Sequence, residues 1–137
     1  MTNEDDSIDF DLDISKVTCT VSQAQPGEGR FIKYRDGVGR YAHVKVVVAP
    51  HPGIHCYRFV WEPLKASLPL SFMRGACLEG VKRALVEPLA DGRQIAFVQV
   101  SIVDGSYHEQ DTDEQAVGIA TFLAVQDALA RASLVDG

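Results

Sequence analysis

The feature that most constrains the fold is a change of hydrophobic period on either side of one polar run, Val103–Asp111. Residues 94–102 alternate in polarity, which is the period of a strand; one face carries Ala96, Val98, Val100 and Ile102. Residues 114–131 have the three- and four-residue spacing of a helix, seen at Ile119, Phe122, Val125 and Leu129. The run is therefore predicted to be a strand-to-helix loop.

Within this loop, Asp104-Gly105 is the predicted turn. Asp111, followed three residues later by Glu114, has the pattern of a capping box and is predicted to start the helix. His108 is then expected near the loop tip, beside a helix N-terminus, where anions are favoured. An aromatic–imidazole pair there could stack on a base or bind a phosphate. Taken alone, these residues favour ordinary loop, turn and cap roles.

The order of the remaining patterns predicts the fold class. Strands are expected at 17–23, 30–34, 41–49 and 57–61, with a hairpin turn at Gln25–Gly29 and a flexible tip at Asp36–Gly39. A helix is expected from a Ser71 cap to about Val86. The expected architecture is α+β: a two-layer sandwich of a mainly antiparallel four- to five-stranded sheet with two helices on one face.

The N-terminal residues carry most of the net charge of −6. Six acids precede the first base, Lys16, and without them acids and bases are equal in number. Residues 8–14 alternate apolar and acidic side chains, but the apolar phase shifts at Ser15-Lys16, so one straight strand cannot hold both sets on one face. Either a bulge intervenes, or Ile8–Ile14 is a separate edge strand, or the segment is a disordered acidic tail. We divide the chain into an acidic extension, 1–15, and one domain, 16–137.

No residue set in the sequence supports catalysis or metal binding. Cys19, Cys56 and Cys77 are spread singly, which indicates reduced, buried thiols rather than a disulfide framework or a zinc site. His51 and His55 flank Pro52-Gly53, so their rings need not converge. The sequence also contains no phosphate-binding glycine loop ending in Lys-Ser/Thr and no long apolar run. We expect a cytoplasmic, non-enzymatic protein without cofactor, nucleotide or membrane.

Two blocks of sequence resemble the fourth domain of bacterial elongation factor G. VSIVDGSYHEQDTDEQAVGIATFLAVQDAL contains GSYHE at the strand–loop–helix junction where that family has GSYH-[DE]. FIKYRDGVGRYAHV, residues 31–44, is similar to the family's F-I-[RK]-Q-T-G-G-x-G-Q-Y-G-H-V segment without a gap. The resemblance covers about Val17–Arg131, and it implies a left-handed β-α-β crossover in the fold. No GTPase domain accompanies it, so we do not expect translocation by this chain alone.

The resemblance also implies a site. In the family the two matching loops lie together at the tip of the domain, which enters the decoding region of the small ribosomal subunit. The residues that would contact RNA or the ribosome here are Lys33, Tyr34, Arg35, Gly37, Gly39, Arg40, Ser106, Tyr107 and His108. Arginines could pair with phosphates and rings could stack on bases. Tyr34–Gly37 replaces Q-T-G-G, which adds an aromatic and alters the loop.

An alternative partner follows from the N-terminal alternation. The acidic strand Ile8–Ile14 could pair with the sheet edge of another protein or of a second copy, with the fold retained only as a scaffold. The two hypotheses are ribosome or RNA binding at the tip and protein interaction at the N-terminal strand.

Overall fold

The computed structural model describes residues 7–35, 37–51, 53, 55–62 and 68–136. The predicted acidic tail before Ser7, Asp36 of the predicted tip and residues 63–67 lie outside this range. The helices are α1 (Met73–Val86) and α2 (Glu114–Arg131). The strands are β1 (Ser7–Phe10), β2 (Thr18–Val21), β3 (Gln25–Arg35), β4 (Val38–Pro50), β5 (Tyr57–Trp61), β6 (Gln94–Ile95), β7 (Val98–Ser106) and β8 (Leu134–Asp136).

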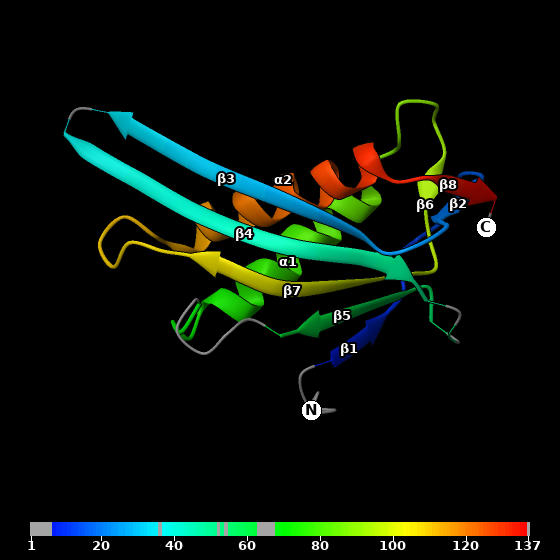
Figure 1. Cartoon of the computed structure of the whole chain (residues 1–137), viewed down its shortest axis with the longest axis horizontal. Helices are drawn as coiled ribbons and strands as arrows, with labels where there is room; N and C mark the ends of the chain where they lie inside the picture. Colours follow the sequence, from blue (N-terminus) through cyan, green and yellow to red (C-terminus); the bar gives the residue numbers. More distant parts are fainter. Residues whose placement is uncertain (1–6, 36, 52, 54, 63–67, 137) are drawn as a thin grey trace.

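Five strands form the main sheet in the order β1-β5-β7-β4-β3, and both helices pack on one of its faces (Figure 1). The strand pairs are antiparallel except β5 with β7, which are parallel and joined through α1. In Figure 1 both strands point toward the β3–β4 turn, β7 lies on the β4 side, and α1 lies behind the sheet. This arrangement is a left-handed crossover, opposite to the usual preference. The predicted α+β two-layer class is confirmed.

The core lies between the sheet and the helices, as period-two and helical spacing predicted. The inward side chains of β4 (Ala42, Val44, Val46 and Val48) are each no more than 1% exposed. One stripe of α1 at helical spacing is buried as well (Met73, Ala76, Cys77, Gly80, Val81 and Ala84). The two helices approach closely at Gly80, where a side-chain carbon would overlap Thr121 of α2 and the backbone of Gly118.

The predicted hairpin turn at Gln25–Gly29 is wrong, because these residues form the first half of β3 and pair with β4 from Val48 to Val44. The glycines have a packing role instead. A Cβ at Gly29 would overlap the backbone of Ala120 and Ala124 in α2, and one at Gly27 would meet Ala128. Glycine in this strand therefore permits α2 to lie directly on the sheet backbone.

The predicted single strand 94–102 is broken in the structure. Gln94–Ile95 belongs to a small three-stranded sheet, β6-β2-β8, and β7 begins at Val98 in the main sheet. The change of sheet occurs at Phe97, whose φ of 58° lies in the left-handed region that non-glycine residues avoid. Its carbonyl accepts hydrogen bonds from Thr20 Oγ1 at 3.1 Å and from the His51 backbone N–H at 2.8 Å. These bonds hold the strained conformation in place.

At its other end β7 continues farther than predicted. Asp104-Gly105 is not a turn, since Asp104, Gly105 and Ser106 pair with Lys45, Val44 and His43 of β4. The register shifts between Lys45 and Val46, which leaves Val103 as an extra residue in a bulge. The loop begins only after Ser106.

The predicted helix starts also need correction. Asp113 caps α2 in place of Asp111, and its Oδ1 accepts a hydrogen bond from the Ala116 N–H at 2.7 Å. The cap residue of α1 is Phe72 in place of Ser71, and it makes no side-chain cap bond. The interior of both helices nevertheless agrees with the predicted periodicity, and α2 has the predicted bounds.

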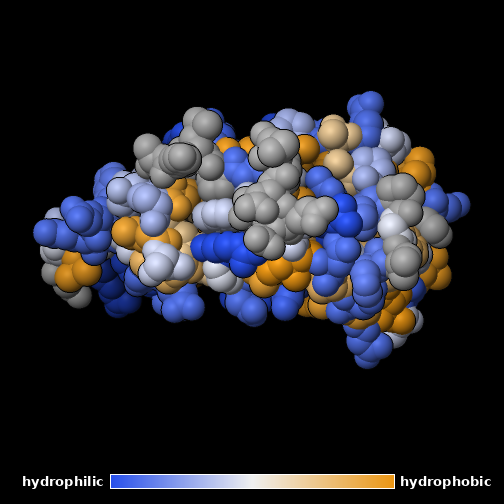
Figure 2. Space-filling view, turned by 90° about the horizontal axis from the view of Figure 1, so that it is seen from below, coloured by the Kyte–Doolittle hydropathy of each residue, from blue (hydrophilic) through white to orange (hydrophobic). Residues whose placement is uncertain are grey.

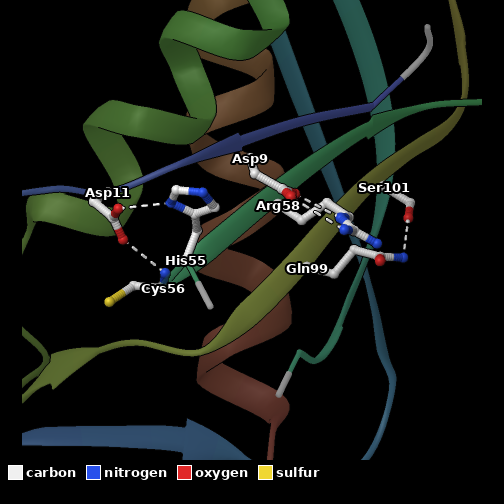
Figure 3. A network of polar contacts seen from close by, with 7 residues as sticks. All are labelled: Asp9, Asp11, His55, Cys56, Arg58, Gln99 and Ser101. Atoms are coloured by element: carbon white, nitrogen blue, oxygen red, sulfur yellow. Dashed lines mark hydrogen bonds and ion pairs between the residues drawn. The ribbon is translucent and has the colours of Figure 1, made fainter. Parts of the chain in front are cut away.

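The N-terminal segment, residues 7–14, forms a strap along the β5 edge of the sheet (Figure 3). A separate edge strand is therefore present, since β1 and β2 lie in different sheets, but it ends at Phe10 and does not reach the predicted Ile14. Asp9 accepts from Arg58 Nε at 2.6 Å and Nη2 at 3.1 Å. Asp11 contacts His55 Nδ1 and accepts from the Cys56 N–H, each at 2.8 Å. The acids therefore anchor the strap while its apolar residues pack on the core.

We expect Gly29→Ala to destabilise the fold by about 2 kcal/mol, because α2 must move away from β3 to admit a methyl group. Gly75→Ala is the matched control. Gly75 is exposed in α1 with open space around its Cα, so alanine should stabilise by up to about 1 kcal/mol. Urea unfolding of both variants measures the difference. Equal free energies of unfolding would contradict the close contact between α2 and β3.

The strap contact predicts a pH dependence. The hydrogen bond and charge of Asp11 raise the pKa of His55 above 6.5, and the same contact, with the Cys56 N–H, lowers the pKa of Asp11. The attraction between Asp11 and His55 is therefore complete at pH values between the lowered pKa of Asp11 and the raised pKa of His55. It is lost as the pH rises through the His55 pKa or falls through the Asp11 pKa. We expect Asp11→Asn to return the His55 pKa toward 6.5 in an NMR titration, and Asp13→Asn to leave it unchanged. A His55 pKa that is identical in both variants contradicts the contact.

Candidate nucleic-acid interface

The far end of the β3–β4 hairpin extends past the helices (Figure 1). Its last cross-strand pairs are Lys33 with Arg40, Tyr34 with Gly39 and Arg35 with Val38. Gly37 turns the chain with a φ of 79°, a value that suits glycine. A Cβ at Gly39 would meet Asp111 Oδ2 at 3.1 Å, which is tight, and Tyr34 Cδ2 at 3.4 Å. Glycine at position 39 therefore leaves room for the Asp111 carboxylate.

Large side chains are exposed at this end. Tyr34 is 79% exposed, Ile32 63% and Val38 65%. Lys33 and Arg35, between them on the chain, are exposed too. Figure 2 shows this narrow end with hydrophilic residues around a few hydrophobic ones. The folded chain gains little burial from these apolar groups, which is typical of a surface that binds a partner.

The loop that follows β7 lies against the outer half of β4. The Tyr41 N–H donates to the Asp111 carbonyl at 2.9 Å, and Thr112 Oγ1 donates to the Tyr41 carbonyl at 2.7 Å. Thr112 Oγ1 also accepts from the His108 N–H at 2.8 Å. Thr112 is buried and its hydroxyl fastens the loop to the strand. The two predicted loops therefore lie at the same end of the molecule.

Tyr41 also holds the imidazole of His108. The two rings are stacked, with centroids 4.1 Å apart and planes within 7°. The His108 side chain is 60% exposed, and its Nδ1 lies 3.8 Å from Asp111 Oδ2. Tyr107, by contrast, is half-buried and packs on the core. His108 thus presents one ring face to Tyr41, while most of its side chain remains open to a ligand.

Arg40 joins the hairpin to the start of α2. Its Nη2 contacts Asp113 Oδ1 and Oδ2 at 3.0 and 3.1 Å and Gln115 Oε1 at 2.9 Å. Its guanidinium also lies 5.2 Å from the centre of the Phe31 ring. Burial opposes ionisation of Asp113, but the Ala116 N–H and Arg40 outweigh it and hold its pKa below the usual range. Arg40 therefore has a structural contact that the sequence did not reveal.

The structure brings the predicted residues together at one end, but in different settings. Lys33, Tyr34 and Arg35 are exposed on the hairpin, and Gly37 and Gly39 shape it. Ser106 ends β7 and is not in the loop, while Arg40 pairs with Asp113. Tyr41 and Thr112, which organise the loop, were missed as site residues. The placement of Tyr41 on the polar face of a predicted strand was the available signal.

The described part of the chain offers few features for metal binding, cysteine chemistry or membrane insertion. Among those residues no group of three or more His, Cys, Asp and Glu side chains is arranged to hold a metal ion. The three cysteines are free; Cys19 and Cys77 are buried as predicted, whereas Cys56 is half-buried. Burial raises the pKa of Cys77 to about 12, which disfavours its thiolate form. No helix in the described ranges has the length and apolar character needed to cross a membrane.

Comparison with known proteins places this geometry in a family. Residues 15–133 match the family model described as elongation factor G, domain IV. Elongation factor G of Aquifex pyrophilus is 33% identical over 116 residues, which cover 85% of this chain and 16% of that protein. A crystal structure of a Thermus thermophilus protein superposes with a TM-score of 0.77 at 28% identity, covering 90% of this chain and 18% of that one.

The chain thus spans less than a fifth of the length of these relatives. The match includes both loops and both helices described above, and it omits β1. The chain belongs to the elongation factor G domain IV family, a family of translation-related domains.

Proposed function

We propose that this chain binds the ribosome or structured RNA through its hairpin end and modulates translation in the cytoplasm, without catalysing a reaction. The observation that carries the proposal is the exposure of Tyr34, at 79%, between Lys33 and Arg35. Successive side chains of a strand point to opposite faces, so the ring offers stacking to a base on one face and the two cations offer charge to a phosphate on the other. The relationship to elongation factor G supports the ribosome as the source of that RNA.

The carboxylates near the tip are less repulsive to RNA than their number suggests. Asp113 accepts from the Ala116 N–H and from Arg40. Asp111 lies 3.8 Å from His108, and Glu114 stands in the first turn of α2, where the helix dipole favours an acid. The cations of the hairpin, Lys33 and Arg35, are both exposed, although the Lys33 ammonium lies 5.8 Å from the centre of the Phe31 ring. The hairpin, and not the helix start, is therefore the proposed phosphate contact.

The alternative, a protein interaction through Ile8–Ile14, has weaker support. In the structure Ser7–Phe10 pairs with β5 of its own chain, and Asp9 and Asp11 bind Arg58 and His55 there. The backbone groups along one edge of this strand are therefore already paired with β5. Its acidic side chains oppose pairing with a second copy, because like charges would face each other. We retain RNA binding as the proposed function.

Removal of Lys33 and Arg35 together should weaken binding and its salt dependence. In ribosome co-sedimentation across a salt series, Lys33→Ala/Arg35→Ala should reduce the slope of log affinity against log salt by about 1.5, as expected for two lost phosphate contacts. The matched control is Lys16→Ala/Arg131→Ala, which removes the same charge from the opposite end. Equal slopes for the two double variants contradict phosphate contact at the hairpin.

Tyr34→Ala tests the stacking contribution separately. Because stacking on a base contributes about 1–3 kcal/mol and little salt dependence, affinity should fall at least several-fold with the slope unchanged. Tyr34→Phe keeps the ring and should retain affinity. Stability should not change, since the Tyr34 side chain is largely exposed. Full ribosome affinity in Tyr34→Ala would exclude stacking by this residue.

A further inference from the structure

A buried histidine lies behind the exposed one. His43 of β4 is 9% exposed, although it lies on the sheet face opposite the helices. Its Nδ1 lies 3.2 Å from Ser106 Oγ on β7, and its Nε2 lies 3.0 Å from Glu28 Oε1 on β3. The second contact has the distance of a hydrogen bond, but the N–H direction is not aligned for one. His43 therefore links a carboxylate on one neighbouring strand to a hydroxyl on the other.

The contacts continue from Ser106 to the candidate interface. Ser106 Oγ is 2.6 Å from the Tyr41 hydroxyl, and the Tyr41 ring carries His108. We call Glu28, His43, Ser106 and Tyr41 the polar relay. It crosses β3, β4 and β7 and ends under the exposed imidazole. Its members come from separate sequence blocks, brought together by the strand register that pairs His43 with Ser106.

One arrangement of protons suits the whole relay. A proton on His43 Nε2 lies near the Glu28 carboxylate, 3.0 Å away though not aligned for a hydrogen bond, and this tautomer leaves Nδ1 as an acceptor. Ser106 then donates to Nδ1 and accepts from the Tyr41 hydroxyl. Both hydroxyl donors then face an acceptor, and the contact with His43 lowers the pKa of Glu28, as expected for a carboxylate that remains charged. In this arrangement the Tyr41 O–H is directed at Ser106, and the plane of the ring is fixed.

We infer that Ser106 and His43 are positioning residues for His108: they fix the ring of Tyr41, and the stack on that ring sets the orientation in which His108 meets RNA. The inference rests on the proposed function for its last step only. A hydroxyl–hydroxyl contact of 2.6 Å restrains the phenol at its far end, while the strand restrains it at Cα. A ring held at both ends offers a rigid platform, which reduces the ordering cost of binding.

This role differs from that implied by the resemblance, in which Ser106 itself contacts the ribosome. Ser106 is half-buried, and its hydroxyl faces Tyr41 and His43. His43 is too buried to meet a ligand directly. Neither residue needs to touch RNA in order to affect binding.

The first test uses the free chain of 137 residues, without RNA. The ring current of Tyr41 should shift the His108 ring protons upfield in the NMR spectrum. Tyr41→Phe keeps the ring but removes the hydroxyl, and Ser106→Ala removes its partner; both should lose most of that shift. Ser106→Thr should retain it. Ser101→Ala is the matched control, because Ser101 is on the same strand, bonds only Gln99 among the described contacts, and lies away from the hairpin end.

The second test is ribosome co-sedimentation with the same variants. The NMR result decides the positioning role, and the co-sedimentation result decides whether His108 is part of the RNA contact. We expect Tyr41→Phe and Ser106→Ala to bind several-fold more weakly, with Ser106→Thr and Ser101→Ala close to the original chain. If the His108 shift is unchanged in both Tyr41→Phe and Ser106→Ala, the positioning role is wrong. If the shift is lost but affinity is unchanged, the relay positions His108 but the imidazole is not part of the proposed RNA contact. Should Ser106→Ala fail to fold, Tyr41→Phe alone decides.

Discussion

The geometry of the hairpin end depends on the direct contact between the backbone of α2 and β3. Gly27 and Gly29 have no side chains, so the helix lies on the strand at Ala120, Ala124 and Ala128. That contact sets the height and direction of α2, and it thereby fixes where its first turn stands relative to β4. Asp113 then reaches Arg40, and the preceding loop reaches Tyr41. A bulkier strand residue would raise the helix and separate these groups.

The site that results has a rigid inner part and an exposed outer part. The inner part consists of Tyr41, Thr112 and Ser106, which join β4, β7 and the loop through short hydrogen bonds. The outer part is the hairpin tip, where Lys33, Tyr34 and Arg35 are exposed to solvent. Rigid support beneath exposed rings and cations suits a surface that must recognise a shaped polyanion. The polar relay extends this support to a residue, His43, that never reaches the surface.

The helices and strands were predicted correctly from the sequence where the hydrophobic periodicity extended over a whole element. Residues 57–61 and 114–131 form the predicted strand and helix, because their periodicity agrees with their burial. Prediction failed where a residue type served a tertiary contact. Gln25–Gly29 has the composition of a turn, yet its glycines are needed for helix packing; Gly105 likewise sits in a strand, where a side chain would meet Leu68. The strands β6 and β8 are too short to leave a pattern.

The candidate site was predictable only in part. GSYHE and the 31–44 block indicated the right end of the molecule through family resemblance, whereas chemistry alone favoured ordinary loop residues. The pairing of Arg40 with Asp113 and the stack of His108 on Tyr41 depend on strand register and helix placement, which a single sequence does not encode in any local pattern. The choice between Asp111 and Asp113 as the cap was likewise settled by three-dimensional contacts.

Hydrogen–deuterium exchange of the chain bound to ribosomes locates the bound surface without any substitution. We expect added protection in residues 33–41 and 106–113, with the strap and β5 unchanged. Protection confined to residues 7–14 and 55–61, with none at the hairpin end, would contradict RNA binding there and would favour interaction through the N-terminal strand.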